Sequence, residues 1–196
     1  WHMRGARPTR DHWSSGGVRT SVIAMAAQRA QAQSSSANLP EGFGVAVVRE
    51  DGKWRCAPLT RSGLSNLGAV ETELCELRSA GAVFGLLNID DEFFVIVRPA
   101  PSGTRLLLSD ATAALDYDIA ADVLEKLDAD VSLDELEEED PFEEGDLGVL
   151  SDLGLPEAVL GVILADDEYA DEQLGRIAQE MGFGDELSAV LDKLSR

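Results

Sequence analysis

The chain has very few of the residue types that most often perform chemistry. Its two histidines, His2 and His12, lie near the start, so the rest of the sequence has none. The commonest general base near neutral pH and the commonest metal ligand are therefore absent from residue 13 onward. Catalysis of the serine–histidine or cysteine–histidine type cannot be assembled without them. We expect no catalytic residue and no enzyme activity.

Cysteine is equally scarce. Cys56 and Cys75 are the two cysteines of the chain, which is too few for a disulfide scaffold, and reduced thiols are expected. Cys56 lies in a strand-like run and Cys75 on the apolar side of a predicted helix, so both are expected to be small core residues. Two distant cysteines do not complete a four-ligand zinc site, and the acidic runs lack the spacing of an EF-hand loop. No metal site is predicted.

Long apolar runs and glycine-rich phosphate loops are also missing. No stretch approaches the roughly 20 apolar residues of a membrane-spanning helix, and no convincing secretory signal occurs, so a cytoplasmic protein without membrane contact is expected. No GxxxxGK[ST] motif is present, and Gly182-Phe183-Gly184 is more simply interpreted as a helix C-cap. We expect no cofactor.

Basic residues are few and unevenly placed. Against 37 acidic residues there are 16 basic ones, which leaves a net charge of −21. Residues 1–40 carry five Arg and one Asp, whereas residues 116–172 contain 22 acidic residues and the single base Lys126. Such a surface repels phosphate backbones, so direct binding of nucleic acid is not expected. It attracts basic protein surfaces in a salt-dependent way.

Composition divides the chain into four predicted parts. Residues 1–40 are rich in Arg, Ser, Ala and Gln and are predicted to be a disordered basic tail. Residues 41–128 are predicted to form an α+β domain, 129–145 an acidic linker, and 146–196 a small helical module. A module of that size has a marginal core and needs support from the first domain or from a partner.

Apolar periodicity within 41–128 predicts the element order ββαβββα. The predicted strands are 43–47, 54–59, 83–89, 93–98 and 105–109, and the predicted helices are 62–79 and 113–127, the second capped by Asp110. We therefore predict an α+β fold with a five-stranded antiparallel sheet and two helices. By element order alone this resembles the profilin-like group that includes longin and roadblock domains, and fold does not establish function.

The sequence after residue 127 divides into an acidic run and a set of short apolar-striped segments. The run 128–145 is dense in Asp and Glu and is predicted to be a self-repelling, extended linker with at most one helical turn. The segments 146–153, 156–165, 171–181 and 185–194 are predicted to be short helices, because each begins on Asp or Pro and carries an apolar stripe.

Three stretches resemble a known family, the tRNA adenosine deaminase-associated proteins of actinobacteria. They are LLLSDATAALDYDIAADVLEKL at 106–127, EGDLGVLSDLGL at 144–155 and EMGFGDEL at 180–187. The resemblance covers roughly residues 41–196 and implies association with a tRNA-modifying deaminase, but it supplies no site residues. The chain is not itself the deaminase, because the H-x-E and P-C-x-x-C motifs that hold the catalytic zinc are absent.

The charge and the resemblance together suggest where a partner binds. An acidic protein could engage the basic, tRNA-facing surface of a tRNA adenosine deaminase. We therefore predict a non-catalytic accessory protein whose partner-binding residues are Asp116, Asp118, Asp122, Asp134, Glu135, Glu137, Glu138, Glu139 and Asp140.

Two other functions remain open from the sequence. One is a self-associating structural or adaptor protein of roadblock-like type, a homodimer formed if the exposed edge of the strand meander pairs with a second copy. The other is an enzyme of unknown reaction that uses carboxylates alone. The acidic run could also be no more than a solubilising tether.

Overall fold

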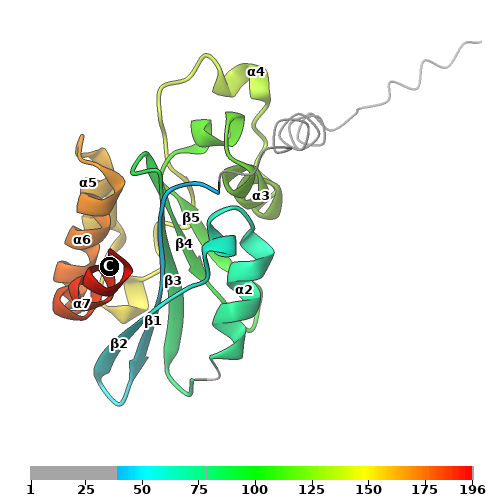
Figure 1. Ribbon diagram of the computed structural model, residues 1–196. Coiled ribbons are helices and arrows are strands. Elements are labelled where there is room, and N and C mark those ends of the chain that lie inside the picture. The colour runs from blue at the N-terminus through cyan, green and yellow to red at the C-terminus, as the bar shows by residue number, and fades with distance from the viewer. Residues whose placement is uncertain (1–38, 78, 196) are drawn as a thin grey trace, which may run out of the picture.

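The computed structural model describes residues 39–77 and 79–195. The predicted disordered tail, apart from its last two residues, lies outside them. Within this part of the chain one antiparallel sheet stands between two layers of helices (Figure 1). This confirms the predicted α+β class.

The sheet has six strands, not the five that were predicted. Its strands are β1 (Gly42–Glu50), β2 (Lys53–Pro58), β3 (Ala82–Ile89), β4 (Phe93–Arg98), β5 (Arg105–Leu108) and β6 (Glu144–Gly145). The spatial order is β2-β1-β3-β4-β5-β6, with every neighbouring pair antiparallel. The edge of the predicted meander, β5, is thus covered by β6, and β2 is the edge at the other end.

The additional strand lies in the predicted acidic linker. Leu107 pairs with Gly145 and Leu108 with Glu144. Gly145 has a φ of +117°, and a Cβ there would stand 2.4 Å from the carbonyl oxygen of Leu106. Glycine is therefore required for so close an approach of the two backbones. A two-residue strand inside an acidic run has no apolar alternation by which it could be predicted.

One face of the sheet is covered by the earlier helices. These are η1 (Arg61–Leu64), α2 (Leu67–Glu76), η2 (Ala111–Leu115), α3 (Asp118–Leu127) and α4 (Leu133–Leu136). Their apolar side chains, such as Val70, Leu74 and Val123, share a core with Leu87, Val95 and other residues of the sheet.

The opposite face is covered by the C-terminal helices. These are η3 (Ser151–Leu153), α5 (Glu157–Ala165), α6 (Ala170–Met181) and α7 (Gly184–Leu194). Phe183 lies between Trp54 and Phe84, with ring centroids 5.1 and 6.0 Å away. Because this core also contains Val45, Phe84 and Ile96 of the sheet, the C-terminal helices obtain the support that a unit of their size needs.

Burial on both faces explains the composition of the central strands. Residues 84–89 of β3 and 93–97 of β4 are buried without interruption. Strands covered on both sides read as continuous apolar runs rather than as alternating patterns.

Three predicted helices are shorter than expected. The predicted helix 62–79 is divided into η1 and α2, because Asn66 accepts a 2.8 Å hydrogen bond from the Ala69 amide and begins a new helix. The predicted helix 113–127 is divided at Asp116 and Tyr117 into η2 and α3, here without a side-chain cap at the start of α3. Within 146–153 only the short η3 forms.

The cysteines correct a further expectation. Both cysteines were expected to be core residues. Cys56 is half-buried and packs against the core of the C-terminal helices, but Cys75 is exposed. It follows Leu74 on α2, and it is Leu74 that faces the sheet.

Two predicted helix caps are confirmed. Asp110 caps η2 by accepting a hydrogen bond from the Thr112 amide, and Gly182 ends α6 at a φ of +86°.

Candidate functional site

The predicted binding residues between Asp134 and Asp140 lie at one end of the molecule. Asp134 and Glu135 belong to the single turn of α4, and Glu137 to Asp140 follow it, all exposed. Leu136 is 3 % exposed in the core, and Phe142 packs against the same core. The Ala111 amide also donates a 2.7 Å hydrogen bond to the Phe142 carbonyl. These contacts hold the acidic run against the body of the protein.

Glu135 has a local role in addition to its charge. Its carboxylate accepts hydrogen bonds from the Ser132 amide (2.8 Å) and hydroxyl (2.9 Å), and the Ser132 hydroxyl accepts from the Glu135 amide at 3.3 Å. This reciprocal arrangement is a capping box at the start of α4. The bonds from Ser132 lower the pKa of Glu135 below its ordinary value. The capping box thereby fixes the turn that presents the other acidic side chains.

Asp122 is less exposed than the predicted binding residues between Asp134 and Asp140. Its half-buried carboxylate accepts a 3.4 Å hydrogen bond from the Leu67 amide at the start of α2. Burial raises the pKa of Asp122, and the bond from Leu67 opposes that rise. Asp122 therefore joins α3 to α2. Asp116 is exposed and Asp118 half-exposed, both at the junction of η2 and α3.

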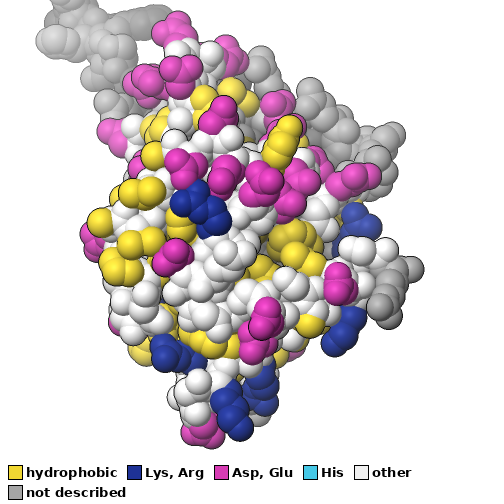
Figure 2. Space-filling model, turned by 90° about the vertical axis from the view of Figure 1, so that its left-hand side faces the viewer, with side chains coloured by type: hydrophobic (Ala, Val, Ile, Leu, Met, Phe, Trp, Pro, Cys, Tyr) yellow, Lys and Arg dark blue, Asp and Glu magenta, His cyan; other side chains and the backbone are white. Residues whose placement is uncertain are grey.

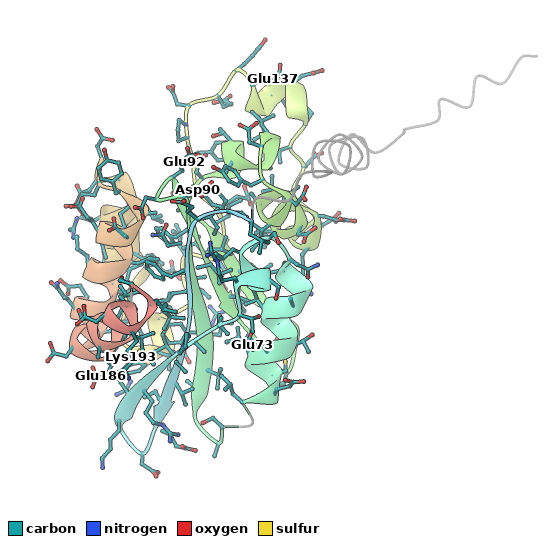
Figure 3. All side chains as sticks on the ribbon, viewed as in Figure 1. Glu73, Asp90, Glu92, Glu137, Glu186 and Lys193 are labelled. Carbon is teal, nitrogen blue, oxygen red and sulfur yellow. The ribbon has the colours of Figure 1, made fainter. Side chains whose placement is uncertain are left out.

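The turn between β3 and β4 brings acidic residues that the sequence did not single out. Asp90 and Asp91 have φ values of 53° and 57°, in the left-handed region, and with Glu92 they form the three-residue connection between β3 and β4. Glu41, Asp90, Asp91 and Glu92 line an open hollow of about 340 Å³. Figure 3 shows Asp90 and Glu92 at the end of the sheet nearest to Glu137. In the sequence Asp90-Asp91 marked only a separator between two strands.

Tyr117 connects this turn to the predicted residues. Its hydroxyl lies 2.8 Å from a carboxylate oxygen of Asp90 and 3.0 Å from one of Glu92. Burial and these two bonds raise the pKa of Tyr117. The hydroxyl can donate to either acceptor, which holds the hairpin turn beside the start of α3.

A third acidic segment, 166–168, follows α5. Arg176 pairs with Asp166 and also with Glu168, the latter at 3.0 Å. The Ala170 amide donates a 3.3 Å hydrogen bond to the Asp91 carbonyl, so the segment lies next to the hairpin turn.

We call these exposed carboxylates together the acidic surface. It comprises Glu41, Asp90, Asp91, Glu92, Asp116, Asp118, Asp134, Glu135, Glu137, Glu138, Glu139, Asp140, Asp166, Asp167 and Glu168. Figure 2 shows many acidic side chains over the upper half of the face that it draws, with a basic one among them, and several basic side chains toward the lower end. The β1–β2 hairpin at the lower end of Figure 1 contains Arg49, Lys53 and Arg55. The same hairpin also contains Glu50 and Asp51, so negative charge is concentrated at the acidic surface and charge is more evenly mixed at the hairpin.

The chemistry available to the described residues is narrow. Both histidines lie outside residues 39–195, and burial raises the pKa of the Cys56 thiol to about 12. Within 39–77 and 79–195 no group of three or more His, Cys, Asp or Glu side chains could hold a metal ion. In the same part of the chain no helix is both long and apolar enough to span a membrane.

Comparisons with known proteins identify the family. No solved structure matches the chain, so the likeness to profilin-like folds rests on element order alone. The chain is 73 % identical to Protein Rv3753c of Mycobacterium tuberculosis (strain ATCC 25618 / H37Rv) over 173 residues, which cover 88 % of this chain and 100 % of the relative. Residues 42–184 match the family described as Rv3753c-like tRNA adenosine deaminase-associated protein. The chain therefore belongs to this tRNA adenosine deaminase-associated family.

Proposed function

We propose that the protein is a non-catalytic accessory of a tRNA adenosine deaminase and binds that enzyme through the acidic surface. Membership of a deaminase-associated family supports the choice of partner. One observation supports the acidic surface as the binding site. Exposed carboxylates of α4, of the β3–β4 turn and of the segment after α5 lie at the same end of the molecule. A field of one sign attracts and orients a basic surface.

The partner expected from this charge is a protein surface that also faces tRNA. An enzyme that holds a phosphate backbone needs Lys and Arg around its active site. The acidic surface is complementary to such a region, so the protein would compete with tRNA or regulate its access. Direct binding of RNA by the acidic surface is disfavoured for the same reason.

Self-association, the alternative function, would require an edge strand of the sheet to pair with a second copy of the chain. The two edges of the described sheet are β2 and β6, and β2, with six residues against two, is the longer. Lys53, Arg55 and Pro58 lie along β2, and charged residues and proline are typical protection against edge-to-edge pairing. Light scattering over a range of concentrations distinguishes a monomer from a dimer.

The test is calorimetric titration of the full chain against the deaminase encoded by the same organism. Titrations at low salt and at about 0.15 M salt differ in screening, because the Debye length is about 8 Å at the higher value. The proposal expects binding that weakens as salt rises. Absence of binding at both salt concentrations would refute it.

A further inference from the structure

Helix α5 is apolar on every side although it lies at the surface. Its sequence, EAVLGVILA, has one charged residue, Glu157. Leu160 and Ile163 are buried in the core that the C-terminal helices share with the sheet, while Ala158, Val162 and Ala165 on the other side are exposed, Val162 to 58 %. A helix that is apolar all round is normally covered all round.

The exposed residues of α5 form one continuous stripe. Ala158, Val162 and Ala165 are spaced four and three residues apart, which aligns them along one face. Gly161 lies beside this stripe, with open space where a Cβ would stand. Tyr169, at the end of the loop that follows α5, is 71 % exposed. Small side chains allow another helix to approach closely, and an exposed tyrosine is a frequent anchor in interfaces.

Acidic residues border this stripe on one side. Asp166, Asp167 and Glu168 follow α5 directly and belong to the acidic surface. Figure 2 shows apolar side chains next to acidic ones on the face formed by the C-terminal helices. An apolar centre with a charged border is the usual arrangement of a protein interface.

The nature of the occupant follows from these two features. Because α5 is a helix, its outer face offers no strand edge to an extended segment. It offers apolar area at helical spacing, which suits the apolar side of an amphipathic helix. The acidic border favours Lys and Arg beside the apolar stripe of that helix.

We propose that the outer face of α5, formed by Ala158, Gly161, Val162 and Ala165 with Tyr169, is a docking site for a basic amphipathic helix of a protein partner. This inference deepens the proposed function, since it takes the deaminase to be the protein that carries the helix. The acidic surface then speeds the encounter, and α5 supplies the apolar contact that sets the lifetime of the complex.

The first test uses the double variant Val162→Gln, Ala165→Gln in the full chain. Both side chains are exposed and glutamine is a good helix former, so the fold should be retained. The matched control is Leu77→Gln, a residue that is 41 % exposed in the opposite layer. Affinity for the deaminase should fall about tenfold in the double variant, with an unchanged salt dependence, and stay the same in the control.

The second test does not depend on the deaminase. It titrates the full chain with an 18-residue peptide, a length of about five helical turns, that has leucine on one helical face and lysine elsewhere. A peptide of the same composition in scrambled order is the control for charge alone. The amphipathic peptide should bind more tightly than the scrambled one, and the α5 double variant should remove that difference.

The outcomes separate the two proposals. If the deaminase does not bind while the amphipathic peptide selects α5, the proposed function fails and the docking site stands. If the deaminase binds equally well to the double variant, the docking site is refuted and the proposed function stands. If both peptides bind alike, the docking site is refuted, and the titration against the deaminase decides the proposed function separately. A shift from dimer to monomer caused by the double variant would assign the face to a second copy, which also refutes the inference.

Discussion

The guanidinium group of Arg98 on β4 forms two parallel hydrogen bonds with the carboxylate of Asp152 in η3, at 2.5 and 2.7 Å. The same guanidinium donates a 2.7 Å bond to the Val149 carbonyl. Arg105 on β5 makes a similar contact with Asp146 at 2.6 Å, and Arg49 on β1 donates to the Leu153 carbonyl at 3.1 Å. Three arginines of the sheet thus hold the segment that leads to the C-terminal helices.

This arrangement predicts that Arg98→Gln destabilises the protein. Removing the guanidinium leaves the Val149 carbonyl without its charged donor, and loss of such a bond costs about 1–3 kcal/mol of unfolding free energy. Lys53→Gln, an exposed change on β2, is the control and should have no measurable effect. Urea unfolding of the two variants beside the parent protein provides the measurement; equal midpoints for Arg98→Gln and the parent would contradict the role of Arg98.

The same pair predicts a dependence on pH. The hydrogen bond from Arg98 is the main cause that lowers the pKa of Asp152. A carboxyl group whose pKa is lowered by folding contributes stability above its unfolded pKa of about 4, and that stability is lost as pH falls through the folded value. The parent should lose more stability below about pH 4 than Arg98→Gln does. Identical acid unfolding profiles would refute this coupling.

Substitution of Gly145 should disturb the sixth strand. In Gly145→Ala the new Cβ meets the Leu106 carbonyl at 2.4 Å, and the backbone is held at a positive φ. Backbone strain of this kind costs about 1–3 kcal/mol, to which the clash adds. Gly175→Ala on α6, where nothing lies within 4 Å, is the control and should stabilise by up to about 1 kcal/mol. Thermal melting of both variants tests whether the melting temperature falls for Gly145→Ala and rises for Gly175→Ala.

The two thiols should differ in reactivity. Cys75 is exposed, whereas the half-buried Cys56 has a pKa near 12, so little of its reactive thiolate forms at neutral pH. An alkylating reagent should therefore modify Cys75 first in the folded protein and both residues after unfolding. Peptide mapping after a short exposure is the measurement, and preferential modification of Cys56 would show that the described packing around it is wrong.

The sequence predicted those parts of the fold that depend on local chemistry. The apolar runs that became β3 and β4, the turn residues between them and the cap at Asp110 are local signals, and each was placed correctly. The pairing of Gly145 with Leu107 depends on contacts more than 30 residues apart, and no local pattern reports it. Cys75 is exposed because it follows Leu74 directly and lies about 100° around the helix from the buried stripe of Leu67, Val70 and Leu74.

The acidic character of the candidate site was predictable from the sequence, but the way the fold brings its residues together was not. The dense run 134–140 was recognised, whereas Asp90, Asp91 and Glu92 are a brief acidic turn that only the folded chain places beside Tyr117. The hydrogen bond that the Asp122 carboxylate accepts from the Leu67 amide was not predictable either, because it depends on α3 lying against the start of α2.

The central claim is that the acidic surface binds the deaminase, and one comparison tests it most directly. One variant carries Glu137→Gln, Glu138→Gln, Glu139→Gln and Asp140→Asn, which spares the capping residue Glu135. The control removes four exposed carboxylates elsewhere, in Asp51→Asn, Glu76→Gln, Glu180→Gln and Asp192→Asn, so both proteins have the same net charge. At low salt, calorimetric titration should show about tenfold weaker binding for the first variant and a much smaller loss for the control. Equal affinities for the two variants would contradict the account.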